Sequence, residues 1–356
     1  MYWRMNIAPT HASPSLSHLW FNPSRRSRPS RRVLSKRLGQ GSAATGSAIK
    51  AIADGSNGSL NVVITGGSKG LGYCMAKEFL SHGDGVVICG RNPERLEASS
   101  AALKELYPEG SIFHKQCNVS SPEDLKEFAD FSAEKLNRID RWINNAGEVT
   151  EKKLLSDLEP SDITQVIGTN VVGSMLGSCE AIRLMRAQPQ SNQPRYHILN
   201  LGFSSWGASF SKSACTHKTT KTALTQLTES LSQELVEAGI TSIGVHNLSP
   251  GMVLTDLLLK DANVIARRFF NALAEEPETV AAVLVPQIRS LAGTNQGIDY
   301  LNPATALARV VGGLPQILFG GRFFDKDGER VVEGGGELRY KKNGVKVLYD
   351  IDAKKY

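Results

Sequence analysis

The stretch Thr65-Gly66-Gly67-Ser68-Lys69-Gly70-Leu71-Gly72 (TGGSKGLG) decides the fold of this chain. It follows the short apolar run Leu60–Thr65 and precedes Leu71–Ser81, whose apolar residues recur at helical spacing. A glycine-rich turn between a strand and a helix is the phosphate-binding element of dinucleotide-binding α/β folds. The stretch therefore predicts a nucleotide site at the first strand–helix connection, whereas a plain turn is the alternative interpretation.

Each glycine of this loop has its own role in that interpretation. Gly66 permits the sharp turn, Gly70 lets the backbone approach a pyrophosphate, and Gly72 lets the helix pack against the strand. The N–H groups at the start of the helix are then available to phosphate oxygens. The candidate cofactor-binding residues of the loop are Thr65, Gly66, Ser68, Lys69, Gly70, Leu71 and Gly72.

Short apolar runs and helix-length amphipathic segments alternate along the rest of the chain. The predicted strands are Leu60–Thr65, Gly85–Cys89, Ser111–Gln116, Arg141–Asn144, Tyr196–Leu201 and Ser242–Asn247. The predicted helices between them are Leu71–Ser81, Pro93–Tyr107, Pro122–Leu136, Ser161–Ala187 and His217–Ala238. This alternation predicts a Rossmann-like doubly wound α/β fold: a parallel sheet, covered on both faces, in a single domain with a helix-rich C-terminal segment.

The basic charge of the chain is concentrated at its N-terminus. The 356 residues carry a formal net charge of +6, yet residues 1–53 contain nine Lys or Arg and no Asp or Glu. A Ser- and Arg-rich segment without acidic residues is typical of an organelle transit peptide, and an attached disordered basic tail is the alternative. We therefore expect a leader over 1–55, one domain over 56–333 and a tail over 334–356. The basicity does not indicate a nucleic-acid-binding face, and no apolar run predicts a membrane-spanning helix.

The end of the second predicted strand indicates which nicotinamide nucleotide is used. Sites for NAD usually carry an acidic residue there, which binds the ribose 2′-OH. This chain has Cys89-Gly90-Arg91-Asn92 instead. Arg91 can bind a 2′-phosphate through several donors, and Lys69 adds a second positive charge. The pattern predicts NADPH, whereas a solvated surface role for Arg91 is the alternative.

The five cysteines predict neither a disulfide framework nor a metal site. They are Cys74, Cys89, Cys117, Cys179 and Cys215, with no C-x-x-C spacing. We expect reduced thiols, most of them buried, and no bound metal. His197 and His246 lie on predicted strands and are expected to be core or edge residues.

Together, the motifs of this chain resemble those of the short-chain dehydrogenase/reductase family. The glycine loop, Asn144-Asn145-Ala146-Gly147, Thr169-Asn170-Val171 and Pro250-Gly251 occur in the family's order within residues 60–256. The resemblance implies that Asn145, Ala146 and Gly147 line the cofactor and support the sheet. It places Asn118 beside the adenine, where the family usually has Asp. It also assigns Pro250, Gly251 and Thr255 to the cofactor, with Thr255 at the nicotinamide amide.

A closer similarity concerns chlorophyll(ide) b reductases of the non-yellow-coloring type, in the form without membrane spans. It rests on the motifs at 250–259, 277–280, 284–286, 300–303 and 321–325. It implies NADPH-dependent reduction of the 7-formyl group of chlorophyll(ide) b to 7-hydroxymethyl in the chloroplast stroma. The helix-rich segment 255–330 would then form a substrate lid, with Phe269-Phe270 and Phe323-Phe324 facing the pigment or packing in the core. A reductase of another bulky carbonyl compound is an alternative.

The resemblance also implies partners. Helices 161–187 and 217–238 are those that pair subunits in this family, so we expect a homo-oligomer or a complex with a related reductase. The pigment substrate implies a peripheral association with the thylakoid membrane. No nucleic-acid partner is expected.

The catalytic motif departs from the family pattern. The family has Tyr-x-x-x-Lys, with Tyr as proton donor and Lys holding the nicotinamide ribose. Here Lys221 is present, but His217 stands in the Tyr position. Ser204 lies 13 residues before His217, the family's spacing for the serine that binds the substrate carbonyl, and Asn170 would complete the proton relay.

Two interpretations of His217 remain open. A neutral imidazole can donate a hydrogen bond to a carbonyl, and Lys221 should lower the pKa of His217 by charge repulsion. A packed helix residue in an enzyme that no longer turns over, binding NADPH and pigment as a partner of an active reductase, is the alternative.

Overall fold

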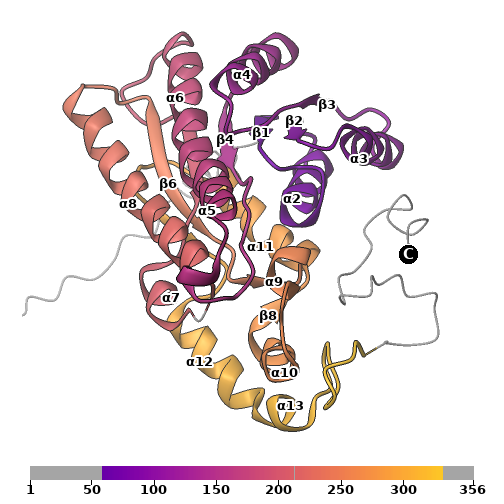
Figure 1. Cartoon of the computed structure of the whole chain (residues 1–356). Coiled ribbons are helices and arrows are strands. Elements are labelled where there is room, and N and C mark those ends of the chain that lie inside the picture. Colours follow the sequence, from indigo (N-terminus) through magenta and orange to yellow (C-terminus); the bar gives the residue numbers. More distant parts are fainter. Residues whose placement is uncertain (1–57, 212, 332–356) are drawn as a thin grey trace, which may run out of the picture. The chain divides into compact units, whose positions relative to one another are not determined.

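A seven-stranded parallel sheet forms the centre of the part of the chain that the computed structural model describes, residues 58–211 and 213–331 (Figure 1). Its strand order is β3-β2-β1-β4-β5-β6-β9. The strands are β1 (Asn61–Ile64), β2 (Gly85–Gly90), β3 (Ile112–Gln116), β4 (Arg141–Asn144), β5 (Tyr196–Leu201), β6 (Ile243–Ser249) and β9 (Gly297–Asp299). The order reverses between β1 and β4, and ligands of doubly wound sheets bind outside the carboxyl ends of the strands at such a point.

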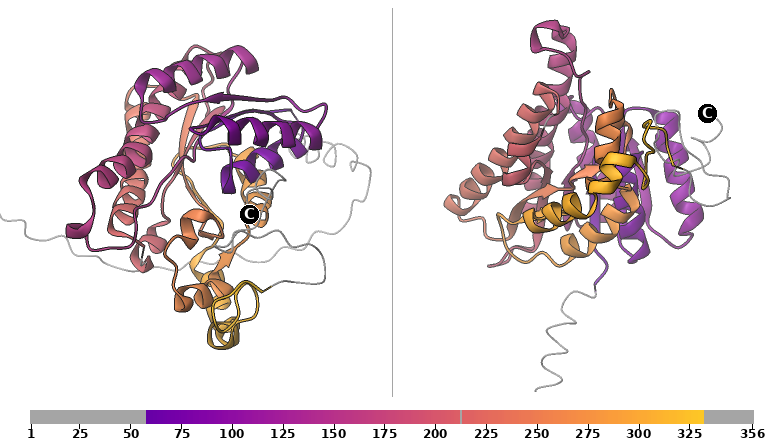
Figure 2. Two further views of the ribbon diagram at one scale, coloured as in Figure 1. Left: turned by 45° about the vertical axis from the view of Figure 1, so that its right-hand side comes forward. Right: turned by 90° about the horizontal axis from the view of Figure 1, so that it is seen from below.

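Helices cover both faces of the sheet, as the uninterrupted apolar strands predict. One face packs against α2 (Gly70–Ser81), α3 (Pro93–Leu106) and α11 (Pro277–Arg289). The other packs against α4 (Pro122–Leu136), α6 (Gly173–Arg186) and α8 (Cys215–Glu237), and Figure 2 shows these layers from two further sides. The predicted doubly wound α/β fold is therefore confirmed.

Two helices begin at the polar residue that precedes a proline. The Asn92 side chain accepts a 2.7 Å hydrogen bond from the Arg95 N–H before α3. Ser121 accepts one of 3.1 Å from the Asp124 N–H before α4. In both helices proline follows the cap, where its missing N–H leaves no hydrogen bond unmade.

Two predictions about secondary structure were wrong in detail. The expected continuous helix 161–187 is α5 (Pro160–Ile167), a π-helical turn η2 (Gly168–Val172) and α6. The strand β9, which pairs with β6, lies in the segment predicted only as helix-rich. β9 has just three residues, one of them glycine, so its sequence carries no strand periodicity.

The C-terminal segment forms a small apolar cluster of its own. The elements of this segment are β7 (Met252–Val253), α9 (Asp256–Leu259), α10 (Val264–Leu273), β8 (Ala274–Glu275), α12 (Pro303–Gly312) and α13 (Leu314–Phe319). The 3₁₀ turn η1 (Leu155–Asp157) and α7 (Ser205–Phe210) lie earlier in the chain, outside this segment. Phe270, Phe323 and Phe324 are buried in this cluster, whereas Phe269 is 40% exposed. Three of the four aromatic rings considered for pigment contact therefore serve packing.

Glu275 joins separate parts of this C-terminal segment through ion pairs with arginines. Both of its carboxylate oxygens accept 2.7 Å hydrogen bonds from Arg322, and Arg309 lies 3.5 Å away. Glu276 pairs with Arg330 through one carboxylate oxygen, Oε1. The C-terminal turn is thus anchored to the strand β8 by two carboxylate–arginine pairs.

Further predictions concern the two ends of the chain, the cysteines, membrane spans and metal sites. The expected leader 1–55 and tail 334–356 lie outside the described residues. Cys74, Cys89 and Cys117 are buried free thiols, and Cys179 and Cys215 are exposed free thiols, so most of the cysteines are buried as predicted. Within residues 58–211 and 213–331, no helix has the length and apolarity to cross a bilayer, and no group of three metal-ligating side chains is present.

Candidate active site

The glycine loop leaves β1 with a backbone that only glycine adopts readily. Gly66 and Gly70 have φ values of +67° and +56°. A Cβ on Gly66 would lie 2.8 Å from the Ala146 Cα, and one on Gly72 would lie 2.4 Å from the Gly66 carbonyl oxygen. Because these contacts are with backbone, no side chain fits at either position without moving the loop. The sequence-based assignments of the sharp turn and the close packing therefore agree with the geometry.

The helix after the loop is open to an anion. Lys69 precedes the first residue of α2, and its side chain makes no capping hydrogen bond to the helix. The first turn of α2 contains no acidic residue. The positive end of a helix with available N–H groups is a binding site for phosphate oxygens, so the loop fits a dinucleotide pyrophosphate.

A polar network joins the glycine loop to the turn after β4. Thr65 Oγ1 accepts 3.0 Å hydrogen bonds from the N–H groups of Asn145 and Ala146. The Asn145 side chain donates to the carbonyl oxygens of Thr65 and Gly66, at 2.8 and 3.1 Å. The structure thus brings together residues about 80 positions apart, and holds the loop against the crevice at the strand-order reversal.

Arg91 reaches from the end of β2 towards the end of β4. Its guanidinium forms an ion pair with Glu148, which follows Gly147. Asn118, at the end of β3, accepts a 3.2 Å hydrogen bond from the Ser120 N–H and donates its backbone N–H to Asp124. Arg91 and Asn118 therefore remain at the carboxyl edge of the sheet, where both were predicted to contact the cofactor.

The opposite side of the crevice comes from the chain after β6. Gly251 has a φ of +71° and follows Pro250. The Thr255 methyl carbon would lie 3.2 Å from a Cβ on Gly70, so Thr255 adjoins the glycine loop. Lys69 forms a 3.0 Å ion pair with Asp256, which links the loop to α9. Ser68 and Leu71 support the loop, since the Ser68 carbonyl accepts a hydrogen bond from Ser99 and Leu71 is buried.

Lys221 is held at the end of β5. Its Nζ donates a 2.7 Å hydrogen bond to the Leu201 carbonyl oxygen and lies 3.7 Å from where a Cβ on Gly147 would stand. Burial lowers the pKa of Lys221 to about 8. A cation at this position is close to the cofactor crevice and can hold a ribose hydroxyl.

Asn170 is fixed within the π-helical turn η2. Its side-chain amide donates to the Glu148 carbonyl and to Thr220, both at 3.0 Å, while its Oδ1 accepts from the Glu148 N–H at 2.8 Å. Asn170 is fully buried. π-helical turns frequently occur at functional sites, and here the extra residue lets one side chain bond both the turn after β4 and the helix α8.

Ser204 and His217 are the remaining predicted catalytic residues. Ser204 is buried at the start of α7, where its Oγ accepts a 3.2 Å hydrogen bond from the Gly207 N–H. The His217 ring packs edge-on against Phe203, with ring centroids 5.6 Å apart. His217 Nδ1 is buried and, within the described residues, has no hydrogen-bond partner. His217 and Lys221 are four positions apart, so both lie on one face of α8.

The electrostatics keep His217 neutral. Burial, and secondarily the charge of Lys221, lower its pKa to about 4. The predicted effect of Lys221 is therefore present, although burial contributes more. At neutral pH His217 can donate a hydrogen bond from its neutral ring, but it carries almost no imidazolium.

Sequence reasoning missed two carboxylates of this site. Glu148 pairs with Arg91, and Asp256 pairs with Lys69, so each cation assigned to the 2′-phosphate has a protein partner. Glu148 directly follows the Asn-Asn-Ala-Gly motif, which was the available signal. No such signal marks Asp256, which is 187 residues away from Lys69.

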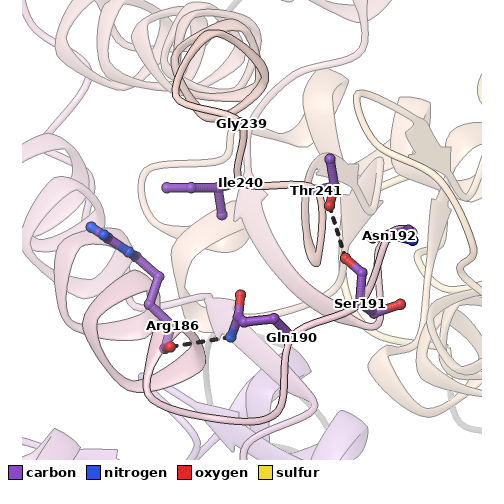
Figure 3. A pocket seen from close by; sticks show the side chains of 7 residues that line it. All are labelled: Arg186, Gln190, Ser191, Asn192, Gly239, Ile240 and Thr241. Carbon is purple, nitrogen blue, oxygen red and sulfur yellow. Dashed lines mark hydrogen bonds between the residues drawn. The ribbon is translucent and has the colours of Figure 1, made fainter.

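A separate hollow of about 470 Å³ lies at the opposite edge of the sheet (Figure 3). Arg186 and the loops before β5 and β6 line it, with hydrogen bonds from Gln190 to the Arg186 carbonyl and from Thr241 to the Ser191 carbonyl. The nucleotide loop leaves the carboxyl ends of the strands, whereas this hollow adjoins their amino ends. It therefore does not belong to the candidate active site.

Comparison with known proteins identifies the family. The short chain dehydrogenase family model matches residues 60–263, more than half of the chain. The chain belongs to the short-chain dehydrogenase family. Within it, His217 stands at the position where the family pattern has Tyr.

Curated relatives within the short-chain dehydrogenase family include plant proteins. The chain is 41% identical to chlorophyll(ide) b reductase NOL, chloroplastic, from Oryza sativa subsp. japonica, over 74% of this chain and 76% of that protein. It is 38% identical to the probable chlorophyll(ide) b reductase NYC1, chloroplastic, from the same organism, over 77% of this chain. The match spans only 55% of that second relative's length.

Solved structures of the family agree with the fold. A short chain dehydrogenase from Burkholderia cenocepacia in complex with NADP is 27% identical, with a TM-score of 0.56 over 67% of this chain and 96% of that chain. A 3-ketoacyl-(acyl-carrier-protein) reductase from Brucella melitensis complexed with NADH has the same TM-score at 24% identity and shows the fold alone. This short-chain dehydrogenase thus has a fold and a loop that support a nicotinamide cofactor.

Proposed function

We propose that this protein uses NADPH to reduce the 7-formyl group of chlorophyll(ide) b, or of a similar large planar pigment, to a hydroxymethyl group. The observation that carries the proposal is the position of Lys221, whose Nζ adjoins both the end of β5 and Gly147. A cation at that point serves a reductase that holds a nicotinamide ribose. The pigment is inferred from the names of the relatives, and the chloroplast is the matching location.

The residues present fit a dinucleotide with a 2′-phosphate. The loop from Gly66 to Gly72 offers backbone N–H groups to the pyrophosphate, and Thr255 adjoins the same loop. Arg91 ends the strand where NAD sites usually have a carboxylate, and an arginine there favours a phosphate. When bound, NADPH would supply the hydride, and a proton must reach the carbonyl oxygen to give the alcohol.

The protein's own residues would bind and orient the substrate oxygen, and the proton would come from solvent, because His217 carries almost no imidazolium near neutral pH. Ser204 would orient the carbonyl by a hydrogen bond. His217 would donate a hydrogen bond from its neutral ring, in the position where the family has Tyr. Lys221 and Asn170 would position the ribose and the donors. A neutral imidazole can polarise a carbonyl in this manner, at some cost in rate relative to a better acid.

The test is a direct assay of the full chain. The protein is incubated with NADPH and chlorophyllide b, and the pigments are separated by liquid chromatography with absorbance detection. Formation of the 7-hydroxymethyl product is expected, coupled one-to-one to NADPH oxidation. A matched Lys221→Ala variant provides the background, and product no greater than this background overturns the proposal.

A further inference from the structure

The ion pair between Arg91 and Glu148 joins the ends of two strands that are not neighbours. Arg91 follows β2 and Glu148 follows the turn after β4, while β1 lies between these strands in the sheet. The glycine loop begins at the carboxyl end of β1. The pair therefore crosses the sheet edge at the point where the nucleotide loop begins.

The two partners are held very differently. The Glu148 carboxylate also accepts a 2.7 Å hydrogen bond from Gln165, and its backbone N–H and carbonyl both bond the Asn170 side chain. Its side chain is 17% exposed, whereas that of Arg91 is 52% exposed. Glu148 is thus fixed from several sides, and Arg91 is the partner that can move.

We propose that Glu148 is a specificity-determining residue, which holds Arg91 in the free protein and yields it to the 2′-phosphate of the incoming nucleotide. This inference rests on the proposed use of NADPH. A phosphate competes with a carboxylate for a guanidinium because both accept paired, charge-assisted hydrogen bonds. A ribose 2′-hydroxyl carries no charge, so NADH leaves the Arg91–Glu148 pair intact.

Competition of this kind predicts the effect of neutralising Glu148. Glu148→Gln keeps the size of the side chain and the backbone contacts with Asn170, but it weakens the hold on Arg91. A partly exposed ion pair contributes modestly, so we expect NADPH to bind roughly two- to fivefold more tightly. The affinity for NADH should remain unchanged.

The experiment is a double-mutant cycle read by isothermal titration calorimetry. The full chain, Glu148→Gln, Arg91→Gln and the double variant are each titrated with NADPH and with NADH. Arg91→Gln should weaken NADPH binding, and Glu148→Gln should then have no further effect. Glu151→Gln removes a nearby exposed carboxylate that pairs with Lys153, and should leave both affinities as they are.

The outcomes separate this inference from the proposed function. If the unaltered protein binds neither nucleotide, the proposed function fails. If it binds NADPH but Glu148→Gln leaves the NADPH affinity unchanged, the exchange of Arg91 is overturned. If Glu148→Gln changes the NADPH affinity equally with and without Arg91, the exchange is also overturned, and the carboxylate acts only by repelling the phosphate. Melting curves verify folding, and Glu148→Asp, with a carboxylate one carbon further from Arg91, should show a smaller tightening of the same sign.

Discussion

The Nζ atom of Lys221 donates a 2.7 Å hydrogen bond to the carbonyl oxygen of Leu201, the last residue of β5. This contact ties the helix α8 to the carboxyl end of the sheet. It also keeps a partly buried ammonium group beside the crevice, with no ion pair to a carboxylate among the described residues. Burial consequently lowers the pKa of Lys221, to about 8.

Reduction should depend on the charge of Lys221. Because its pKa lies near 8, the cationic fraction falls as the pH rises through that value. We expect kcat/KM for NADPH-dependent reduction to decline above about pH 8, and Lys221→Ala to abolish it. Lys218→Ala is the matched control, since its Nζ contacts only the Ser211 carbonyl among the described groups, at 3.4 Å. A flat profile up to pH 9.5 would contradict a role for the cation.

His217 should contribute to the rate and not to cofactor binding. His217→Phe removes the ring nitrogens but keeps an aromatic ring against Phe203, so the fold should persist. General acids contribute roughly 10²–10⁴-fold, and a neutral ring should lie at the low end, so we expect kcat to fall about 100-fold. The calorimetric affinity for NADPH should stay constant. His82→Phe, at an exposed surface position, is the control.

The His217→Tyr variant measures how much turnover is lost by having His in place of the family's Tyr. His217→Tyr restores the family's residue, and we expect its turnover to lie within about tenfold of that of the unaltered chain. A gain of several orders of magnitude would identify the present chain as an impaired enzyme that serves as a binding partner. Steady-state assays with NADPH and chlorophyllide b decide between these results.

Asn170→Ala should affect both stability and activity. The substitution leaves the partly buried Glu148 N–H and carbonyl without their partner, and an unsatisfied buried polar group costs about 1–3 kcal/mol. We therefore expect a lower free energy of unfolding in urea, together with loss of reduction. Asn192→Ala, in an exposed loop, should change neither. A stable but inactive Asn170→Ala protein would assign the residue to catalysis alone.

A buried histidine pair should make the protein sensitive to acid. His197 Nδ1 and His246 Nε2 lie 2.9 Å apart on adjacent strands. Burial, then the charge of Arg141, lowers the pKa of His197 to about 2 and that of His246 to about 4. The folded pKa values of both histidines lie below the ordinary 6.5. The free energy of unfolding is therefore not reduced by these histidines above about pH 6.5, and it decreases as the pH falls from there towards 4.

Urea unfolding at pH 7.5 and pH 5 measures this loss. We expect the free energy of unfolding to fall by about 4 kcal/mol between them, because each of the two histidines loses about 1.36 kcal/mol per pH unit over the roughly 1.5 units between pH 6.5 and pH 5. The double variant His197→Leu/His246→Leu removes both partners and should lose distinctly less. His82→Leu, which alters an exposed histidine, should retain the full decrease. Equal decreases in all three proteins would assign the acid sensitivity to other groups.

The sequence alone determined the architecture and most of the nucleotide loop. Strand-length apolar runs alternating with helices have few folded arrangements other than a covered parallel sheet. The loop glycines between strand and helix then locate the site at one edge, and the four-residue spacing of His217 and Lys221 places both on one helical face. These features depend on local spacing, which a sequence displays directly.

Only the tertiary structure decided which distant groups meet at that edge. Arg91 and Glu148 are 57 residues apart, and they pair because the sheet places β2 and β4 on either side of β1. Asn170 bonds the Glu148 backbone because a π-helical turn interrupts the expected long helix. Phe323 and Phe324 pack inward because Asn271 binds their backbone N–H groups. Such contacts follow from strand order and helix register, which periodicity does not encode.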